Sequence, residues 1–125
     1  MQARNLEILI HSPTTCVVRL YGEHDVSSRE ALSTALVAAS RYDHVLVDLA
    51  RCMFVDSTLI SVLLAASKRA GERGGSVELV VPSEANAVRR TLELANVQRV
   101  LPFHASCSTA LESIAAAEPV PYGAA

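Results

Sequence analysis

The chain opens with two short apolar runs that a turn separates. Residues 6–10 (LEILI) and 15–21 (TCVVRLY) are rich in leucine and β-branched residues, as expected of strands. His11, Ser12 and Pro13 between them are typical of a turn. Two strands this close in sequence form a hairpin, so we expect an antiparallel pair.

After Gly22 the apolar spacing changes from that of a strand to that of a helix. Ser27 followed three residues later by Glu30 is a capping-box signature, which predicts a helix from there to about Ser40. Four residues recur at helical spacing and are expected to face inward: Leu32, Ala35, Leu36 and Ala39.

The rest of the chain alternates strand and helix signals. Residues 45–49 (VLVDL) are nearly all apolar, which predicts a central strand covered on both faces. A second helix opens at residues 54–58 and ends near residues 71–75. Residues 77–81 form the next strand, and a third helix starts at residues 82–84, with Asn96 as its left-handed C-cap. We expect a short strand at residues 100–101 and a last helix over about 107–116. The inward positions of these last two helices are Ala85, Val88, Leu92, Ala95, Ala110, Leu111, Ile114 and Ala115.

The predicted order ββαβαβα(β)α defines the fold class. Strands that alternate with helices imply right-handed crossovers and parallel pairing, and the opening hairpin adds an antiparallel part. We therefore expect an α/β protein with a small mixed, mostly parallel β-sheet and about four helices. Residues 1–117 form a single domain, and residues 118–125, with two prolines and a glycine, are a flexible tail.

Composition narrows the class of function. With 125 residues, half of them hydrophobic but only 4% aromatic, the chain has a core of aliphatic side chains. A net charge of −2 spread along the chain argues against direct nucleic-acid binding. The most apolar stretch, residues 53–66, is too short and too polar to insert into a membrane, which takes about 20 apolar residues.

The termini and cysteines indicate a cytoplasmic protein. The first residues lack the apolar segment and cleavage site of a signal peptide. Cys16, Cys52 and Cys107 are widely separated and odd in number, which fits reduced, mostly buried thiols better than a disulfide framework. The sequence leaves open whether the chain forms a homodimer.

The most informative polar residues lie where a strand meets a helix. Asp56 is a favoured N-cap, which makes Ser57 and Thr58 the first two helical residues. Their hydroxyls then lie at the positive end of the helix dipole, which favours a phosphate by roughly 0.3–1 kcal/mol per charge. The alternative is that this tripeptide is only a helix cap.

Other candidate residues carry less chemistry. His11, His24, His44 and His104 lie far apart and are interpreted as surface or loop histidines. Cys52 is interpreted as a buried structural thiol rather than a reactive one. Cysteines and histidines are not spaced as metal ligands, and no glycine-lysine pair follows a strand, so we expect neither a metal nor another cofactor.

Four segments, in order, resemble the STAS domain family, which includes the anti-sigma-factor antagonists. Residues 45–64 (VLVDLARCMFVDSTLISVLL) are similar to the family's apolar strand, short link, Asp-Ser-Ser/Thr-Gly-Leu and apolar helix. Residues 20–25 (LYGEHD), 74–80 (GGSVELV) and 92–97 (LELANV) resemble three further motifs. Each motif is weak alone, but the four together cover about residues 6–116 and are fairly specific.

This resemblance implies a binding protein that phosphorylation switches. In family antagonists, an anti-sigma factor with serine-kinase activity phosphorylates the serine after the aspartate, here Ser57, with Thr58 as the alternative. The unphosphorylated antagonist binds the anti-sigma factor and frees the sigma factor, and the phosphorylated form lets go. The resemblance implies no enzymatic activity and predicts this partner-binding set: Glu23, His24, Asp25, Asp56, Ser57, Thr58 and Leu59.

Two departures from the family pattern keep other functions open. The family's glycine is Leu59 here, which we expect to place a bulky side chain on the partner-facing turn, and a family leucine is His24. One alternative is a non-phosphorylated STAS-like adaptor subunit of a membrane transport or lipid-trafficking complex. Another is a hydrolase or transferase with Ser57 or Cys52 as nucleophile, which would need an adjacent base.

Overall fold

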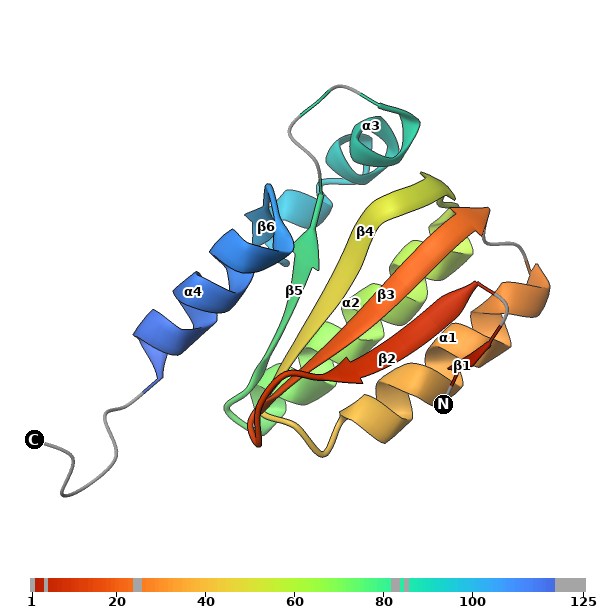
Figure 1. Ribbon diagram of the computed structural model, residues 1–125. Helices are drawn as coiled ribbons and strands as arrows, with labels where there is room; N and C mark the ends of the chain where they lie inside the picture. The colour runs from red at the N-terminus through yellow and green to blue at the C-terminus, as the bar shows by residue number, and fades with distance from the viewer. Residues whose placement is uncertain (1, 4, 24–25, 82–83, 85, 119–125) are drawn as a thin grey trace, which may run out of the picture.

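Six strands form one mixed sheet in the order of the chain, β1-β2-β3-β4-β5-β6, within the described residues (Figure 1). The computed structural model describes residues 2–3, 5–23, 26–81, 84 and 86–118, with the backbone alone at residues 2–3, 23 and 26–28. The strands are β1 (Gln2–Ala3), β2 (Leu6–Ile10), β3 (Thr15–Glu23), β4 (His44–Phe54), β5 (Ser76–Val80) and β6 (Phe103–His104). The helices are α1 (Val26–Ala39), α2 (Ser57–Glu72), α3 (Ala87–Leu94), the 3₁₀ helix η1 (Val97–Arg99) and α4 (Cys107–Ala117).

The pairing of the strands confirms the predicted fold class. β1, β2 and β3 pair antiparallel, and β3, β4, β5 and β6 pair parallel. β1 was not expected, because two residues are too few to show an alternating pattern. The last strand lies at Phe103–His104 rather than at residues 100–101, because the chain first makes the 3₁₀ turn of η1.

The helices divide between the two faces of the sheet. α1 and α2 lie side by side on one face, as Figure 1 shows, and bury the main core against β3, β4 and β5. α4 packs on the other face, where Ala110 meets Val17, Leu46 and Val80. Every residue of the run 45–49 is buried, so the prediction of a strand covered on both faces is confirmed.

Several helix ends differ from the predicted ones. α1 begins at Val26, so Ser27 lies in its first turn and not at the N-cap position. α3 begins only at Ala87, where the Asn86 side chain accepts a hydrogen bond of 2.8 Å from the Arg89 amide. Of the residues expected to start that helix, Pro82 and Ser83 lie outside the described residues, as does Ala85, which was expected to face inward.

The interior positions of the helices largely match the periodicity. The four predicted inward residues of α1 are all buried, as are Val88, Leu92, Ala110 and Ile114. Ala95 and Ala115, also expected to face inward, are exposed, and Leu111 is half-buried. Asn96 adopts a φ of 59°, so its prediction as a left-handed C-cap is confirmed.

β4 is longer than the apolar run that predicted it. Its pairing with β5 ends at Asp48, but its pairing with β3 continues to Phe54. Two register shifts in that last part, between Arg19 and Tyr21 and between Gly22 and Glu23, bend the pair. This extension carries the chain past the end of β5 before α2 begins.

The turn from α2 into β5 is closely packed against the loop before β4. The Ser76 amide donates a hydrogen bond of 2.9 Å to the Asp43 carbonyl oxygen. A Cβ atom on Gly75 would overlap that same carbonyl oxygen. Only glycine fits here without moving the backbone.

Candidate functional site

Asp56 caps α2, as the sequence predicted. Its backbone is extended, with φ −120° and ψ 176°, and its Oδ1 accepts a hydrogen bond of 2.8 Å from the Leu59 amide. The carbonyl oxygen of Asp56 also accepts the first helical bond, from the Ile60 amide at 3.1 Å. The carboxylate therefore fixes the first turn of the helix.

Ser57 and Thr58 occupy the first two positions of α2. Ser57 is exposed and Thr58 is half-buried. Helix geometry gives their amides no intrahelical acceptor, so both amides contribute to the positive end of the helix. The carbonyl oxygen of Ser57 accepts a hydrogen bond of 2.9 Å from the Ser61 hydroxyl. The Ser57 hydroxyl is thus presented to solvent on an ordered helical turn.

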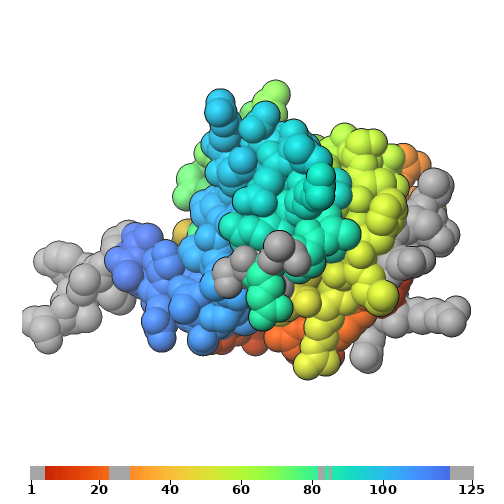
Figure 2. All heavy atoms as spheres, turned by 90° about the horizontal axis from the view of Figure 1, so that it is seen from above, coloured from red at the N-terminus to blue at the C-terminus, as the bar shows by residue number. Residues whose placement is uncertain are grey.

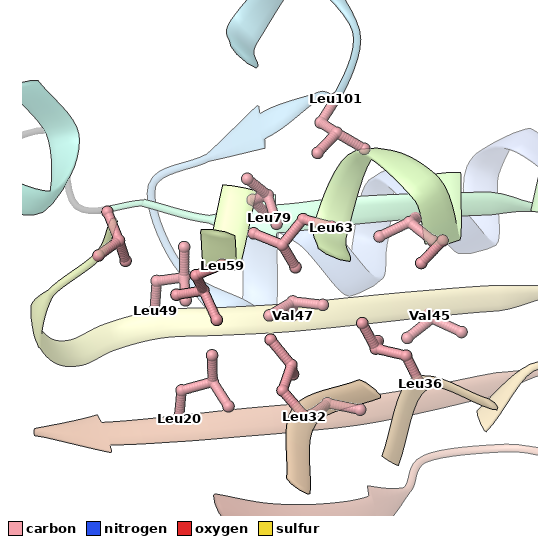
Figure 3. Close-up of a cluster of buried hydrophobic side chains, with 14 of the residues drawn as sticks. Leu20, Leu32, Leu36, Val45, Val47, Leu49, Leu59, Leu63, Leu79 and Leu101 are labelled. Carbon is pink, nitrogen blue, oxygen red and sulfur yellow. The ribbon is translucent and has the colours of Figure 1, made fainter. Parts of the chain in front are cut away.

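Leu59 is buried, contrary to its expected place on a partner-facing turn. Its exposed fraction is 2%, and Figure 3 shows it among the core side chains near Leu49, Leu63 and Leu79. The reason is helical geometry: Leu59 and Leu63 are one turn apart on the apolar face of α2. Leu59 therefore presents no side chain to a partner in this structure.

The segment predicted to adjoin Asp56 begins at Glu23, the last residue of β3. Glu23 pairs with Phe54, two residues before Asp56, so the ends of β3 and β4 lie side by side. The side chain of Glu23 and all of His24 and Asp25 lie outside the described residues. Of the predicted contact loop, only this backbone position is described.

Sequence reasoning did not single out Met53 and Phe54, which precede the cap. They are 68% and 49% exposed, whereas Cys52 and Val55 on either side are buried. Viewed from above, Figure 2 shows the yellow surface of this end of β4 beside the teal surface of α3. The hydrophobicity of both residues would alone predict that they are buried in the core. Their exposure follows from β4 running on past β5.

The pKa of the thiol is raised at all three cysteines. Cys16 is fully buried, and burial raises the pKa of its thiol. Cys52 donates a hydrogen bond of 3.4 Å to the Phe54 carbonyl oxygen, and burial is the main cause of its raised pKa. The pKa of Cys107 is also raised, first by burial and then by the negative charge of Asp48. These shifts agree with the interpretation of Cys52 as a structural thiol.

Two histidines are less accessible than expected. The side chains of His44 and His104, on β4 and β6, are 18% and 14% exposed. Both belong to one network of polar side chains. His104 Nε2 lies 2.7 Å from Glu78, Ser76 donates to Glu78 at 2.9 Å, and His44 Nδ1 lies 2.8 Å from Ser76. Because strand positions were not assigned to these histidines, their partners across the sheet could not be predicted.

A carboxylate at the end of α4 extends this chain of contacts. Glu118 lies 3.6 Å from His44 Nε2 and accepts a hydrogen bond of 2.6 Å from the Thr14 hydroxyl. Among the described residues, no cluster of histidine, cysteine or carboxylate side chains has the geometry of a metal site. No helix within the described residues is long and apolar enough to cross a bilayer.

Solved structures with the same fold include anti-sigma factor antagonists. An anti-sigma factor antagonist from Mycobacterium paratuberculosis superposes with a TM-score of 0.80 at 22% identity, over 92% of this chain and 99% of that one. The antagonist SpoIIAA in its unphosphorylated form gives 0.77 at 18% identity, over 91% and 99%. The Bacillus cell fate determinant SpoIIAA in its phosphorylated form gives 0.69 at 16%, over 87% and 98%.

A family model supplies the sequence counterpart of this likeness. It is described as "Mlab, STAS domain" and matches residues 9–102, well over half of the chain. The match includes β3, β4, α2 and β5, and with them the Asp56 cap and Ser57. The chain belongs to the STAS domain family.

Proposed function

We propose that the protein is an anti-sigma factor antagonist whose binding is controlled at Ser57. The unphosphorylated form binds a kinase-type anti-sigma factor and so releases the sigma factor, and phosphorylation of Ser57 ends the binding. One observation carries the proposal: an exposed serine hydroxyl stands at the first position of a capped helix, beside exposed apolar residues.

The surroundings of Ser57 suit a switch that leaves the fold intact. A phosphoryl group adds about −1.5 to −2 charges, which the amino end of α2 tolerates. Asp56 holds the first turn, and Leu59 anchors it in the core. The modification therefore changes the surface without melting the helix.

The same charge explains the loss of the partner. Met53 and Phe54 form the apolar part of the proposed contact surface beside Ser57. Binding removes water from such a surface, and an unpaired phosphate and the nearby Asp56 carboxylate would then be costly to bury. Glu23, His24, Asp25 and Thr58 complete the proposed contact surface.

The comparisons support the proposal at the level of fold. The solved SpoIIAA structures include an unphosphorylated and a phosphorylated form of one protein with this fold. At 18% and 16% identity to this chain, they support a shared fold but do not identify a shared partner. The phosphorylation, the kinase partner and a cytoplasmic location are therefore our proposals for this chain.

A catalytic role for Ser57 has little support in the geometry. β4 has 11 residues and is roughly 33 Å long, with His44 at its start and Ser57 just past its end. His11 lies in the turn before β3, which runs parallel to β4, so it too is at the far end. A serine nucleophile needs a base within hydrogen-bond reach, and neither His11 nor His44 can provide one. His24 lies outside the described residues. We propose a binding protein and not an enzyme.

The test is phosphorylation of the full chain by purified anti-sigma kinases. Each kinase-type anti-sigma factor encoded in the same genome is incubated with the chain and ATP, and phosphorylated residues are mapped by mass spectrometry. We expect one kinase to modify Ser57. The Ser57→Ala variant should then take up no phosphate but still bind that kinase, and Ser57→Asp should bind it at least tenfold more weakly.

Thr58→Ala is the matched control, because it removes the neighbouring hydroxyl and keeps Ser57. It should be phosphorylated like the unmodified chain. Phosphate on Thr58 in place of Ser57 would make Thr58 the regulatory phosphorylation site and would overturn the assignment to Ser57. Phosphate on neither residue with every kinase would overturn the proposal.

The second candidate function is a non-phosphorylated adaptor subunit of a membrane transport or lipid-trafficking complex. It is favoured by the name of the matching family model, Mlab, which is not that of an anti-sigma factor antagonist. In an adaptor, Ser57 is only part of the helix start. A complex with transport subunits that forms equally with the unmodified chain and with Ser57→Asp would establish this function instead.

A further inference from the structure

A groove of about 230 Å³ lies between α1 and α2. Its lining includes Arg29 and Ser33 of α1 and Thr58, Ser61, Ala65 and Arg69 of α2. The four α2 residues recur every three or four positions, so they share one face of that helix. Small side chains at Ser33, Ser61 and Ala65 leave the space open.

The groove begins at the amino ends of both helices. α1 follows β3 and α2 follows β4, and because these strands are parallel the two helices run in the same direction. Arg29 lies near the start of α1, and Thr58 is the second residue of α2. One end of the groove therefore adjoins Ser57.

The charged side chains that line the groove are both positive. Its lining contains two arginines, three hydroxyl side chains and no carboxylate. Among the described residues neither Arg29 nor Arg69 forms an ion pair through its guanidinium group. Glu30 and Glu72 are close in sequence but do not line the groove.

Helix stability does not explain Arg29. A positive charge near the amino end of a helix opposes the helix dipole, and α1 has no acidic residue in its first turn to compensate. Arg69 differs, because it lies near the carboxyl end of α2, where a cation is favourable. The placement of Arg29 is thus unfavourable with respect to the helix dipole, and an anion bound in the groove would offset this effect. Asp25, just before α1, lies outside the described residues.

We propose that this groove binds an acidic segment of the partner protein. The inference rests on the proposed function in that the same partner would also cover Ser57. Carboxylates of the segment would pair with Arg29 and Arg69, and the hydroxyls of Ser33 and Thr58 would donate hydrogen bonds to it.

The numbers of charges favour a protein over other polyanions. Surfaces that bind acidic lipids typically gather four to eight lysines and arginines, whereas this groove holds two arginines. Nucleic-acid sites follow a basic stripe on a basic domain, but this chain has a net charge of −2. A short acidic peptide needs no more than the two separated cations.

The first test uses a defined acidic probe and the full chain. Acetylated octaglutamate is titrated into the ¹⁵N-labelled chain, and amide shifts are followed by NMR. We expect the largest shifts at Ser33, Ser61 and Ala65, and at least tenfold weaker binding by the double variant Arg29→Glu with Arg69→Glu. The matched control is Arg90→Glu, an exposed charge reversal on α3, which should bind like the unmodified chain.

Three results would overturn the inference. These are no binding of octaglutamate, equal binding by the double variant, and preferential binding of oligothymidylate or phosphatidylglycerol vesicles to the groove. Circular dichroism of each variant checks that its helices remain folded. None of these measurements requires a partner to be known.

A second test separates this inference from the proposed function. The kinase that modifies Ser57 is titrated with the double variant and with Arg90→Glu. Loss of affinity only in the double variant supports the groove as part of the interface. Equal affinity overturns the groove but leaves the switch at Ser57 standing, and octaglutamate binding without any kinase supports the groove alone.

Discussion

Four consecutive residues at the start of α2 have four different environments. Asp56 binds the Leu59 amide, Ser57 faces solvent, Thr58 is half-buried beside a groove, and Leu59 is in the core. The cap could be predicted because aspartate before a helical pattern has few other local uses. The burial of Leu59 could not, because comparison with a family glycine suggested a surface position, whereas the rotation of the helix decides the matter.

The buried position of Leu59 gives a stability prediction. Leu59→Ala should lower the free energy of unfolding by about 2–5 kcal/mol, because it removes buried methyl groups and leaves a cavity. Urea unfolding measures the change. The matched control is Leu94→Ala, since Leu94 is 76% exposed and its loss should change stability by no more than about 0.5 kcal/mol. Equal effects at the two positions would contradict the structure.

At the scale of elements, patterns located the strands and helices better than their ends. β2, β3 and α1 follow directly from their apolar spacing, and the start of α2 follows from Asp56. The end of β4 did not follow, because residues 50–54 pair with β3 alone and show no alternation. Met53 and Phe54 became candidate contact residues only once this pairing was known.

The α2–β5 turn makes a prediction in which two glycines respond oppositely. Gly75→Ala should destabilise the protein, because the new Cβ atom would overlap the backbone carbonyl of Asp43, which cannot rotate away. Gly71→Ala should stabilise it by about 0.5–1 kcal/mol, since Gly71 lies within α2 and its Cβ would enter open space. Thermal unfolding of the two variants should shift the midpoint in opposite directions. Shifts of the same sign would be inconsistent with this turn.

At the scale of the whole molecule, the fold separates a network of polar side chains from the candidate site. The contacts from Thr14 through Glu118, His44 and Ser76 to Glu78 and His104 join the turn before β3, three strands and the end of α4. Sequence spacing could not predict this network of contacts, because the network depends on strands that crossover connections bring together. It lies at the opposite end of β4 from most residues of the proposed interface.

The buried thiols predict a loss of stability in alkaline solution. Burial raises the pKa of Cys16 and Cys52 above the ordinary value of 9.0, so the folded chain holds these protons more tightly than the unfolded chain. The resulting stability is fully present below pH 9.0 and is lost as the pH rises through the folded-state values.

The measurement is the free energy of unfolding between about pH 8 and pH 10.5. Stability of the unmodified chain should fall more steeply over this range than that of Cys16→Ala, in which the thiol is absent. Lysines and tyrosines titrate in both proteins, so the difference between the two slopes reports Cys16. Parallel curves would argue against the raised pKa.

The exposure of Ser57 on an ordered helical turn also affects how fast this residue could be modified. A modifying enzyme would meet its substrate in the native conformation, so no opening equilibrium would slow its access. Removal of the group would likewise need no refolding. The response time of such a switch would then be set by how often the protein meets the enzyme and by enzyme turnover. The rest of the domain would not need to change its conformation.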